Sequence, residues 1–265
     1  MSPAPGFSLT FLGTGTSVGV PMVGCDCEVC RSADPRDKRL RSSLYVRGPG
    51  CDLVIDTGPD FRTQCLREGI RHLDAALFTH AHTDHIMGFD DLRRFTVGQF
   101  HSLDIYARPE TLAAIKTAFG FAFNGENRYV GYLKPEPHEV AGPFALGDAG
   151  IRAEPVACLH GKVETIGYQF SLGGERRFAY LPDCKTLPPE SIGKLRGVPL
   201  LIIDALRLSE HPTHMNIAEA TAAAEAIRPG ATIFTHFSCE VSHARESANL
   251  PPGIRLAYDG MKVAC

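Results

Sequence analysis

Four side chains of the kinds that bind metals lie within one seven-residue stretch, Thr79 to His85. His80, His82 and His85 supply imidazoles, and Asp84 supplies a carboxylate. Neutral imidazole and carboxylate are the usual nitrogen and oxygen ligands of zinc and similar divalent ions. Alternation along an extended segment places His80 and His82 on one side, while Asp84 and His85, after a turn, can face a second ion. We therefore interpret the stretch as a metal-binding loop rather than an ordinary solvated loop.

A second cluster consists of thiols. Cys25, Cys27 and Cys30 follow one another with C-x-C-x-x-C spacing. Thiolates select zinc or iron–sulfur clusters, and a closed site needs four ligands, so the fourth must come from elsewhere in the chain. The nine cysteines form no regular framework, and residues 1–6 lack the basic-then-apolar pattern of a secretory signal. We therefore expect thiols and metal ligands rather than disulfides, in a cytoplasmic protein.

Further candidate residues stand where apolar segments end, a common place for a binding loop on an α/β scaffold. Four residues of ligand type do so: Asp56, His160, Asp183 and His236. His214 lies just ahead of a helix start that the capping pair Asn216 and Glu219 predicts. A helix start favours a bound anion, so His214 is a candidate for contact with an anionic substrate, with His211 as its nearby competitor.

The elements that must position these residues alternate between strand and helix patterns, and no internal repeat or low-complexity linker interrupts them. This pattern predicts an α/β fold and one domain over residues 1–265. Residues 61–69 are expected to form a helix with Leu66 facing inward.

Gly13 and Gly15 predict a tight turn rather than an anion-binding loop, because the Gly-Lys-Ser/Thr of a P-loop does not follow.

Composition excludes some classes of function. Apolar residues make up 44% of the chain and charged residues 22%, as in an ordinary globular protein. The net charge of −3 provides no overall basic field for nucleic acid or anionic membranes, so a nucleic-acid partner is not expected. The chain has no run of 18 apolar residues, which argues against a membrane span.

The motif H-x-H-x-D-H after an apolar strand resembles the signature of the metallo-β-lactamase superfamily. The resemblance implies an αββα sandwich, with two mixed sheets flanked by helices and two divalent ions at one edge. It implies that one ion is held by His80, His82 and His160, the other by Asp84, His85 and His236, with Asp183 bridging them. It also implies that Asp56 supports the metal loop from behind.

Within that superfamily, the segments Leu12 to Ser17 and Thr235 to Ser238 look like the phosphodiesterase branch that contains tRNase Z. The thiol cluster looks closer to the PhnP-like phosphodiesterases, in which three thiols bind a structural zinc together with a histidine. In this chain the matching position is Cys239. Since cysteine is an equally good zinc ligand, we expect one structural zinc on Cys25, Cys27, Cys30 and Cys239.

The resemblance implies a metal-dependent phosphodiesterase acting on a small cyclic phosphate or nucleotide-type diester, with zinc or manganese in the active site. Two divalent ions would acidify a water molecule for attack on phosphorus. Asp84 would position this nucleophile, and His214 would contact the phosphoryl oxygen or protonate the leaving group. Family similarity also suggests a homodimer. The alternatives are tRNA 3′ processing, thioester or lactone hydrolysis, and a non-enzymatic role like that of the pyrroloquinoline quinone-biosynthesis proteins.

Overall fold

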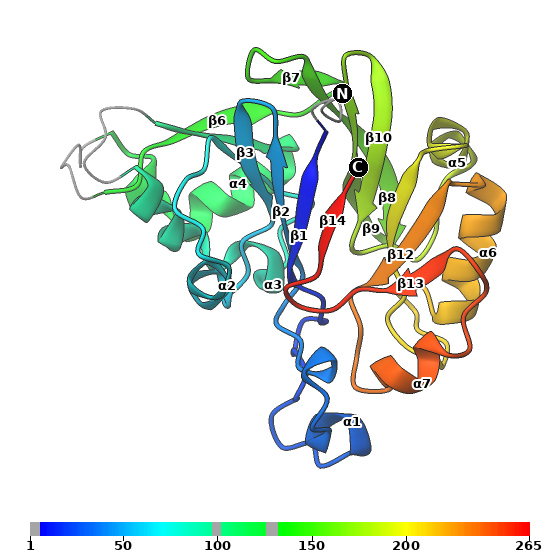
Figure 1. Ribbon diagram of the computed structural model, residues 1–265. Helices are drawn as coiled ribbons and strands as arrows, with labels where there is room; N and C mark the ends of the chain where they lie inside the picture. The colour runs from blue at the N-terminus through cyan, green and yellow to red at the C-terminus, as the bar shows by residue number, and fades with distance from the viewer. Residues whose placement is uncertain (1–5, 97–101, 126–131) are drawn as a thin grey trace.

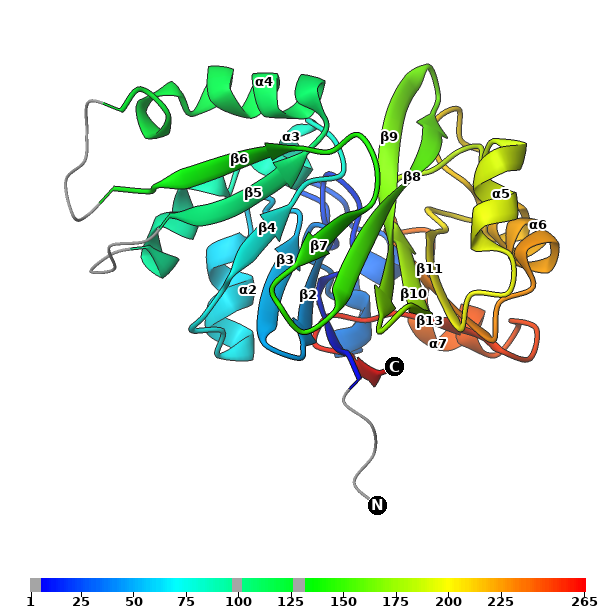
Figure 2. The same cartoon turned by 90° about the horizontal axis from the view of Figure 1, so that it is seen from above.

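Two β-sheets pack face to face and carry helices on their outer surfaces, as Figures 1 and 2 show for the computed structural model. The structure describes residues 6–96, 102–125 and 132–265. The predicted αββα sandwich is therefore confirmed. Within the described ranges, no helix is long and apolar enough to cross a membrane.

The first sheet contains seven strands and includes both ends of the described chain. Its strands β3 to β6 run parallel to one another, whereas β14, β1, β2 and β3 pair antiparallel in turn. In spatial order the strands are β14 (Lys262–Ala264), β1 (Ser8–Gly13), β2 (Ser43–Gly48), β3 (Cys51–Ile55), β4 (Ala75–Leu77), β5 (Leu103–Ala107) and β6 (Pro135–Glu139).

The second sheet also has seven strands, of which β10 to β13 run parallel. The long hairpin of β8 and β9 pairs His160 with Val163 next to its turn. In spatial order the strands are β13 (Ile254–Leu256), β12 (Ala231–Thr235), β11 (Leu200–Asp204), β10 (Glu175–Leu181), β9 (Val163–Leu172), β8 (Ile151–His160) and β7 (Phe144–Leu146).

The helices are short and fall into two layers and one loop region (Figure 2). Those beside the first sheet are α2 (Phe61–Glu68), α3 (Thr83–Ile86), α4 (Pro109–Ala118) and the 3₁₀ helices η2 (Phe89–Phe95) and η3 (Gly120–Ala122). Those beside the second sheet are α5 (Pro189–Leu195), α6 (Ile217–Ile227) and α7 (His243–Ser247). The segment between β1 and β2 holds α1 (Glu28–Arg31) and η1 (Pro35–Asp37) and protrudes from the sandwich (Figure 1).

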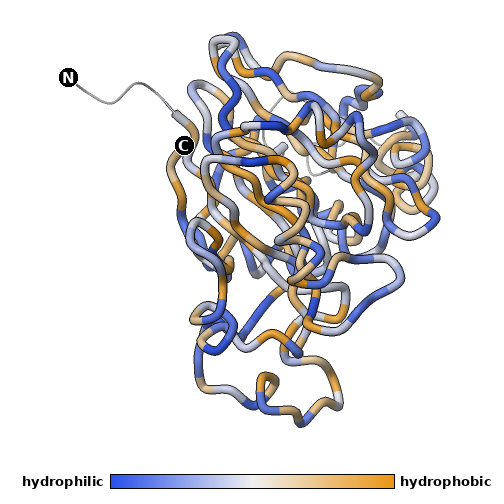
Figure 3. The backbone as a smooth tube through the Cα atoms, turned by 90° about the vertical axis from the view of Figure 1, so that its right-hand side faces the viewer, coloured by the Kyte–Doolittle hydropathy of each residue, from blue (hydrophilic) through white to orange (hydrophobic). Residues whose placement is uncertain are grey.

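Alternation along the strands divides the apolar side chains between two layers. In β3, Leu53 and Ile55 join the cluster between the sheets, while Val54 joins the cluster under the helices of the first sheet. Successive strand residues point to opposite faces, so a strand covered on both sides must be apolar throughout. Hydrophobic segments accordingly run through the strands in the middle of the molecule (Figure 3).

One expectation about side-chain direction is wrong. The helix predicted over residues 61–69 forms as α2, but Leu66 is 66% exposed, and the buried side chains of this helix are Phe61 and Gln64. The Gln64 amide donates a hydrogen bond to the backbone oxygen of Arg41 at 2.8 Å, which draws this polar residue inward in place of leucine.

The tight turn predicted at Gly13 and Gly15 is wrong: Gly13 ends β1, Gly15 forms bridges to Arg41 and Phe237, and the turn comes later, where Gly19 N–H donates to Thr16 O at 2.8 Å. Glycine is required at both positions because two chain segments approach closely there. A Cβ on Gly13 would lie 1.9 Å from the backbone oxygen of Arg41, and one on Gly15 would lie 2.8 Å from that of Arg39. Only glycine fits such contacts. The two glycines thereby let the start of the protruding segment lie against its end.

Candidate metal centre

The predicted ligands meet at one edge of the sandwich, where strands from both sheets end. The ligand atoms of His80, His82, His160 and Asp183 lie within 4.8 Å of one another, and those of His85, Asp183 and His236 form a second such group. These residues follow β4, β8, β10 and β12. The two groups share Asp183, which is the arrangement expected of a residue that bridges two ions.

Asp183 lies at the centre of the imidazoles. Its Oδ1 is 3.3 Å from His85 Nε2 and 3.2 Å from His236 Nδ1, and its Oδ2 is 3.5 Å from His80 Nε2. Burial opposes the charge of this carboxylate, but the surrounding histidines outweigh it and hold the pKa of Asp183 well below its usual range. Asp84 lies outside both ligand groups, although its Oδ2 is 3.2 Å from His85 Nε2.

Asp56 organises the metal loop from behind. The backbone N–H and the Oγ1 hydroxyl of Thr79 each donate to its carboxylate at 2.8 Å, and His85 Nδ1 donates at 2.7 Å. Thr79 Oγ1 in turn lies 3.0 Å from His80 Nδ1 and accepts its hydrogen bond. The Asp56 carboxylate therefore fixes the ring orientation of two candidate ligands, a common arrangement behind metal-binding histidines.

The other two buried rings are oriented in the same way. His160 Nδ1 donates to the backbone oxygen of Thr213 at 2.8 Å, and His236 Nδ1 lies 2.9 Å from the hydroxyl of Ser42. In these four buried candidate ligands Nδ1 thus contacts a protein acceptor, so Nε2 is the ring nitrogen that remains to bind a metal; His80 Nε2 lies 3.0 Å from His82 Nδ1, another candidate ligand. Burial lowers the pKa of His80 and His160, and that of His236 to about 3, so these rings are neutral as metal ligands must be.

Three buried atoms at this edge have no hydrogen-bond partner among the described residues: His85 Nε2, His236 Nε2 and Asp183 Oδ1. Leaving a buried polar atom unpaired costs about 1–3 kcal/mol. Divalent cations would satisfy these lone pairs, and the nitrogen and oxygen donors suit zinc and similar metals. The residues present therefore fit bound divalent ions.

His214 lies beside the centre and has a carboxylate behind it. Its Nδ1 donates to Asp204 Oδ2 at 2.7 Å, and its ring stacks on His236 with centroids 4.9 Å apart. His211 is more exposed, bonds Thr213, and has its ring centroid 5.1 Å from that of His214. The geometry thus favours His214 over His211 for contact with a substrate at the metals.

Asp204 is a site residue that the sequence interpretation missed. It is fully buried at the end of β11, and it also accepts the backbone N–H of Cys184 at 3.0 Å. Burial raises the pKa of Asp204 to about 7 despite the opposing effect of His214. Burial would lower the pKa of His214, but Asp204 outweighs it and raises that pKa. The available signal was an acidic residue at a strand end, as at Asp183.

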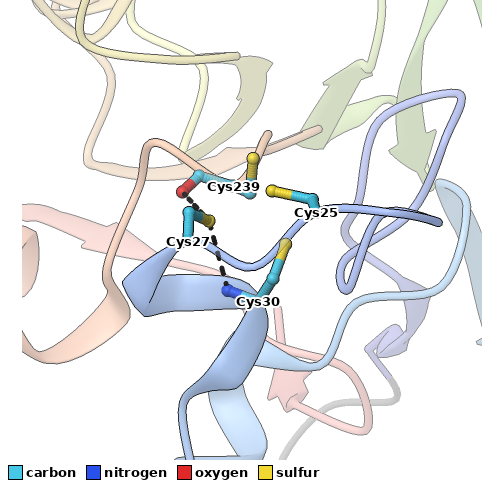
Figure 4. A group of neighbouring side chains, drawn as sticks. All are labelled: Cys25, Cys27, Cys30 and Cys239. Atoms are coloured by element: carbon cyan, nitrogen blue, oxygen red, sulfur yellow. Dashed lines mark hydrogen bonds between the residues drawn. The ribbon is translucent and has the colours of Figure 1, made fainter.

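The four predicted zinc ligands converge where the protruding segment meets the loop that follows β12 (Figure 4). The sulfur atoms of Cys25, Cys27, Cys30 and Cys239 lie within 4.8 Å of one another, and all nine cysteines are free thiols. The backbone N–H of Cys30 donates to Cys27 Sγ at 3.4 Å and lowers the pKa of that thiol to about 7. This arrangement fits a closed four-thiolate zinc site.

A buried arginine connects the protruding segment to the strand that ends before His236. Arg39 donates to the backbone oxygens of Ser238 at 3.1 Å and Val241 at 2.8 Å, and its guanidinium lies 5.0 Å from the ring centroid of Phe237. Asp37 provides its counter-charge at 3.2 Å. Nothing in the sequence pattern indicated this contact.

Comparison with known proteins agrees with the fold. Residues 52–237 match the family model described as a beta-lactamase superfamily domain. The fold and site therefore define a member of the metallo-β-lactamase superfamily. A solved structure described as a new diphosphatase from the PhnP family is 40% identical, with a TM-score of 0.89 over 98% of this chain and 97% of that one. The chain belongs to the PhnP family within the superfamily.

Two curated relatives carry other names. An octanoyltransferase from Porphyromonas gingivalis is 39% identical over 254 residues, which are 95% of this chain but only 50% of that protein. The chain thus spans about half the length of this relative. The coenzyme PQQ synthesis protein B of Methylorubrum populi is 30% identical over 76% of this chain and 74% of that protein.

Proposed function

We propose that the chain is a metal-dependent hydrolase that cleaves a small cyclic phosphate or nucleotide-type phosphodiester. The observation that carries the proposal is the pair of ligand groups that share Asp183, with three buried ligand atoms that have no hydrogen-bond partner among the described residues and with His214 beside them. The relative described as a PhnP-family diphosphatase supports chemistry at phosphorus.

Each ligand group would hold one divalent ion, zinc or manganese. His80, His82 and His160 would bind the first, and Asp183 would bind both. His85 and His236 would bind the second together with Asp84, which lies beside His85 but outside the ligand group. Such ions supply activation of a water molecule as the nucleophile and neutralisation of charge on the phosphoryl oxygens. A separate structural zinc would be held by Cys25, Cys27, Cys30 and Cys239.

The chain's own residues supply the proton chemistry. His214, kept protonated by Asp204, donates a hydrogen bond to a phosphoryl oxygen or passes its Nε2 proton to the leaving oxygen. Because Nδ1 is bonded to Asp204, only Nε2 of this ring can point at the substrate. Asp84 Oδ2, close to His85 Nε2, orients the attacking nucleophile.

A second candidate function is hydrolysis of an acyl thioester, and the octanoyltransferase relative is the observation that favours it. The matched half of that protein need not be the half that handles octanoyl groups, so phosphodiester hydrolysis remains our proposal. The net charge of −3 disfavours tRNA processing, and the complete set of ligands disfavours a purely cofactor-binding role.

The test is hydrolysis of bis(p-nitrophenyl) phosphate by protein loaded with manganese or with zinc, compared with p-nitrophenyl phosphate and an acyl thioester. We expect cleavage of the diester in preference to the monoester, lost in His80→Ala. Diester cleavage that is absent from fully metal-loaded protein, together with thioester cleavage, would replace this proposal with the second candidate.

A further inference from the structure

A cavity separate from the metal centre lies on the outer side of the first sheet. It has a volume of about 830 Å³, within the range of small-molecule sites. Its walls come from α2, from the turn that follows α2, and from η2: Phe61, Arg62, Cys65, Leu66, Gly69, Ile70, Arg71, Asp91, Arg93, Arg94 and Phe95. None of these residues belongs to the candidate metal centre.

The cavity is basic although the chain as a whole is acidic. Four guanidinium groups and one carboxylate line it, whereas the whole chain has a net charge of −3. Arg93 pairs with Asp90 at 3.5 Å, but the side chains of Arg62, Arg71 and Arg94 form no hydrogen bond or ion pair with any described residue. Guanidinium groups match the geometry of phosphate oxygens, so the free donors favour a phosphate-bearing ligand.

The rest of the lining provides an apolar surface and one acceptor. Phe61 and Phe95 are buried with ring centroids 6.3 Å apart, and Leu66 remains 66% exposed on this side of α2. A leucine left in contact with solvent beside two aromatic rings suits a planar apolar group. The half-buried carboxyl of Asp91 can accept a hydrogen bond from a hydroxyl or amine on the same ligand.

We propose that this cavity binds a nucleoside monophosphate. The base would lie against Leu66, the exposed apolar side chain of the lining, a sugar hydroxyl or the exocyclic amine would donate to Asp91, and the arginines would hold the phosphate. A single ligand of this class uses the apolar, acceptor and cationic parts of the lining together. Inorganic phosphate would use only the arginines, and a nucleoside would use only Leu66 and Asp91.

The experiment is calorimetric titration of the metal-loaded protein with AMP, inorganic phosphate, adenosine and a ten-nucleotide RNA. The double variant Arg71→Gln/Arg94→Gln removes two cavity charges. The double variant Arg152→Gln/Arg255→Gln removes two charges from exposed strand positions and is the matched control. His236→Ala separates AMP bound at the metal centre from AMP bound in the cavity.

We expect AMP to bind at least about tenfold more tightly than phosphate or adenosine, and the cavity variant to lose at least about tenfold in AMP affinity. The control variant should bind AMP normally, His236→Ala should keep the cavity site, and the cavity variant should hydrolyse the aryl diester within about twofold of the parent rate.

Three results would overturn the assignment: unchanged AMP affinity in the cavity variant, binding that disappears in His236→Ala, or RNA binding tighter than AMP through the same arginines. Because diester hydrolysis is measured separately, failure of the cavity proposal and failure of the proposed function are distinguishable.

Discussion

Replacing Asp204 with asparagine tests whether the buried carboxylate maintains His214 as an acid. The side chains have nearly the same shape, and the asparagine oxygen can still accept the backbone N–H of Cys184. What disappears is the negative charge 2.7 Å from His214 Nδ1. Burial then acts on the imidazolium without opposition, so the pKa of His214 falls below its ordinary value.

The size of the effect follows from that one contact. A hydrogen bond between charged groups contributes about 1.5–3 kcal/mol, which corresponds to a pKa shift of about one to two units. Because the active form is the protonated ring, the alkaline limb of the pH profile should move down by about that amount. At pH values above the parent pKa of His214 the rate of diester hydrolysis should fall by about ten- to hundredfold, and the loss should shrink as the pH is lowered.

The assay is kcat/KM for bis(p-nitrophenyl) phosphate between pH 5 and 9 (on the order of ten points), with metal content and melting temperature measured on the same samples. Metal content should stay close to that of the parent. In a His214→Ala background, Asp204→Asn should cause no further loss, because the ring that it positions is gone. An equal loss in both backgrounds, or a parent-like pH profile, would refute the reasoning.

Asp56→Asn should weaken metal binding by about 10- to 100-fold because two histidines lose their orienting acceptor, and metal analysis after dialysis would detect this; undiminished metal content would contradict it. Zinc affinity of the four-thiol site should fall at least about tenfold per pH unit below pH 7, since protons compete for the thiolates, among them Cys27, whose pKa is about 7. Competition with a chromophoric chelator measures this, and a pH-independent affinity would be inconsistent with thiolate binding. Arg39→Met should cost about 3–5 kcal/mol of unfolding free energy by leaving buried Asp37 without its counter-charge, and a urea titration would test it; a change below about 1 kcal/mol would count against a structural role.

The metal loop and the thiol cluster could be predicted from the sequence because their residues are close together in the chain. His80 and His85 are five positions apart, and Cys25 and Cys30 likewise, so spacing alone indicates a shared site. His160 and His236 are far from the metal loop in the sequence, and they could be predicted because each stands where an apolar strand ends. Their ligand roles stay predictions.

The residues that spacing did not reveal act through contacts between distant parts of the chain. Arg39 bonds carbonyls about 200 positions away, and a lone arginine near a loop gives no sign of that. Asp204 looks in sequence like any turn aspartate until His214 is brought beside it. The prediction that Leu66 faces inward was wrong because α2 buries Gln64 instead. Gln64 is drawn inward by its hydrogen bond to the backbone oxygen of Arg41, which is distant in sequence.

The protruding segment and the metal edge behave as one structural unit because both depend on residues 236–241. His236 has a left-handed backbone with φ of 66°, which costs a non-glycine residue about 1–3 kcal/mol. The residues that follow His236 are held in place by the hydrogen bonds that Phe237 exchanges with Thr14 at 2.8 Å and Thr16 at 3.0 Å, and by the Arg39 bond to Ser238. Cys239, three residues after His236, adds the thiol cluster to the same loop. Release of zinc from the thiols should therefore loosen His236 and lower the occupancy of the second ligand group, although no thiol touches that group.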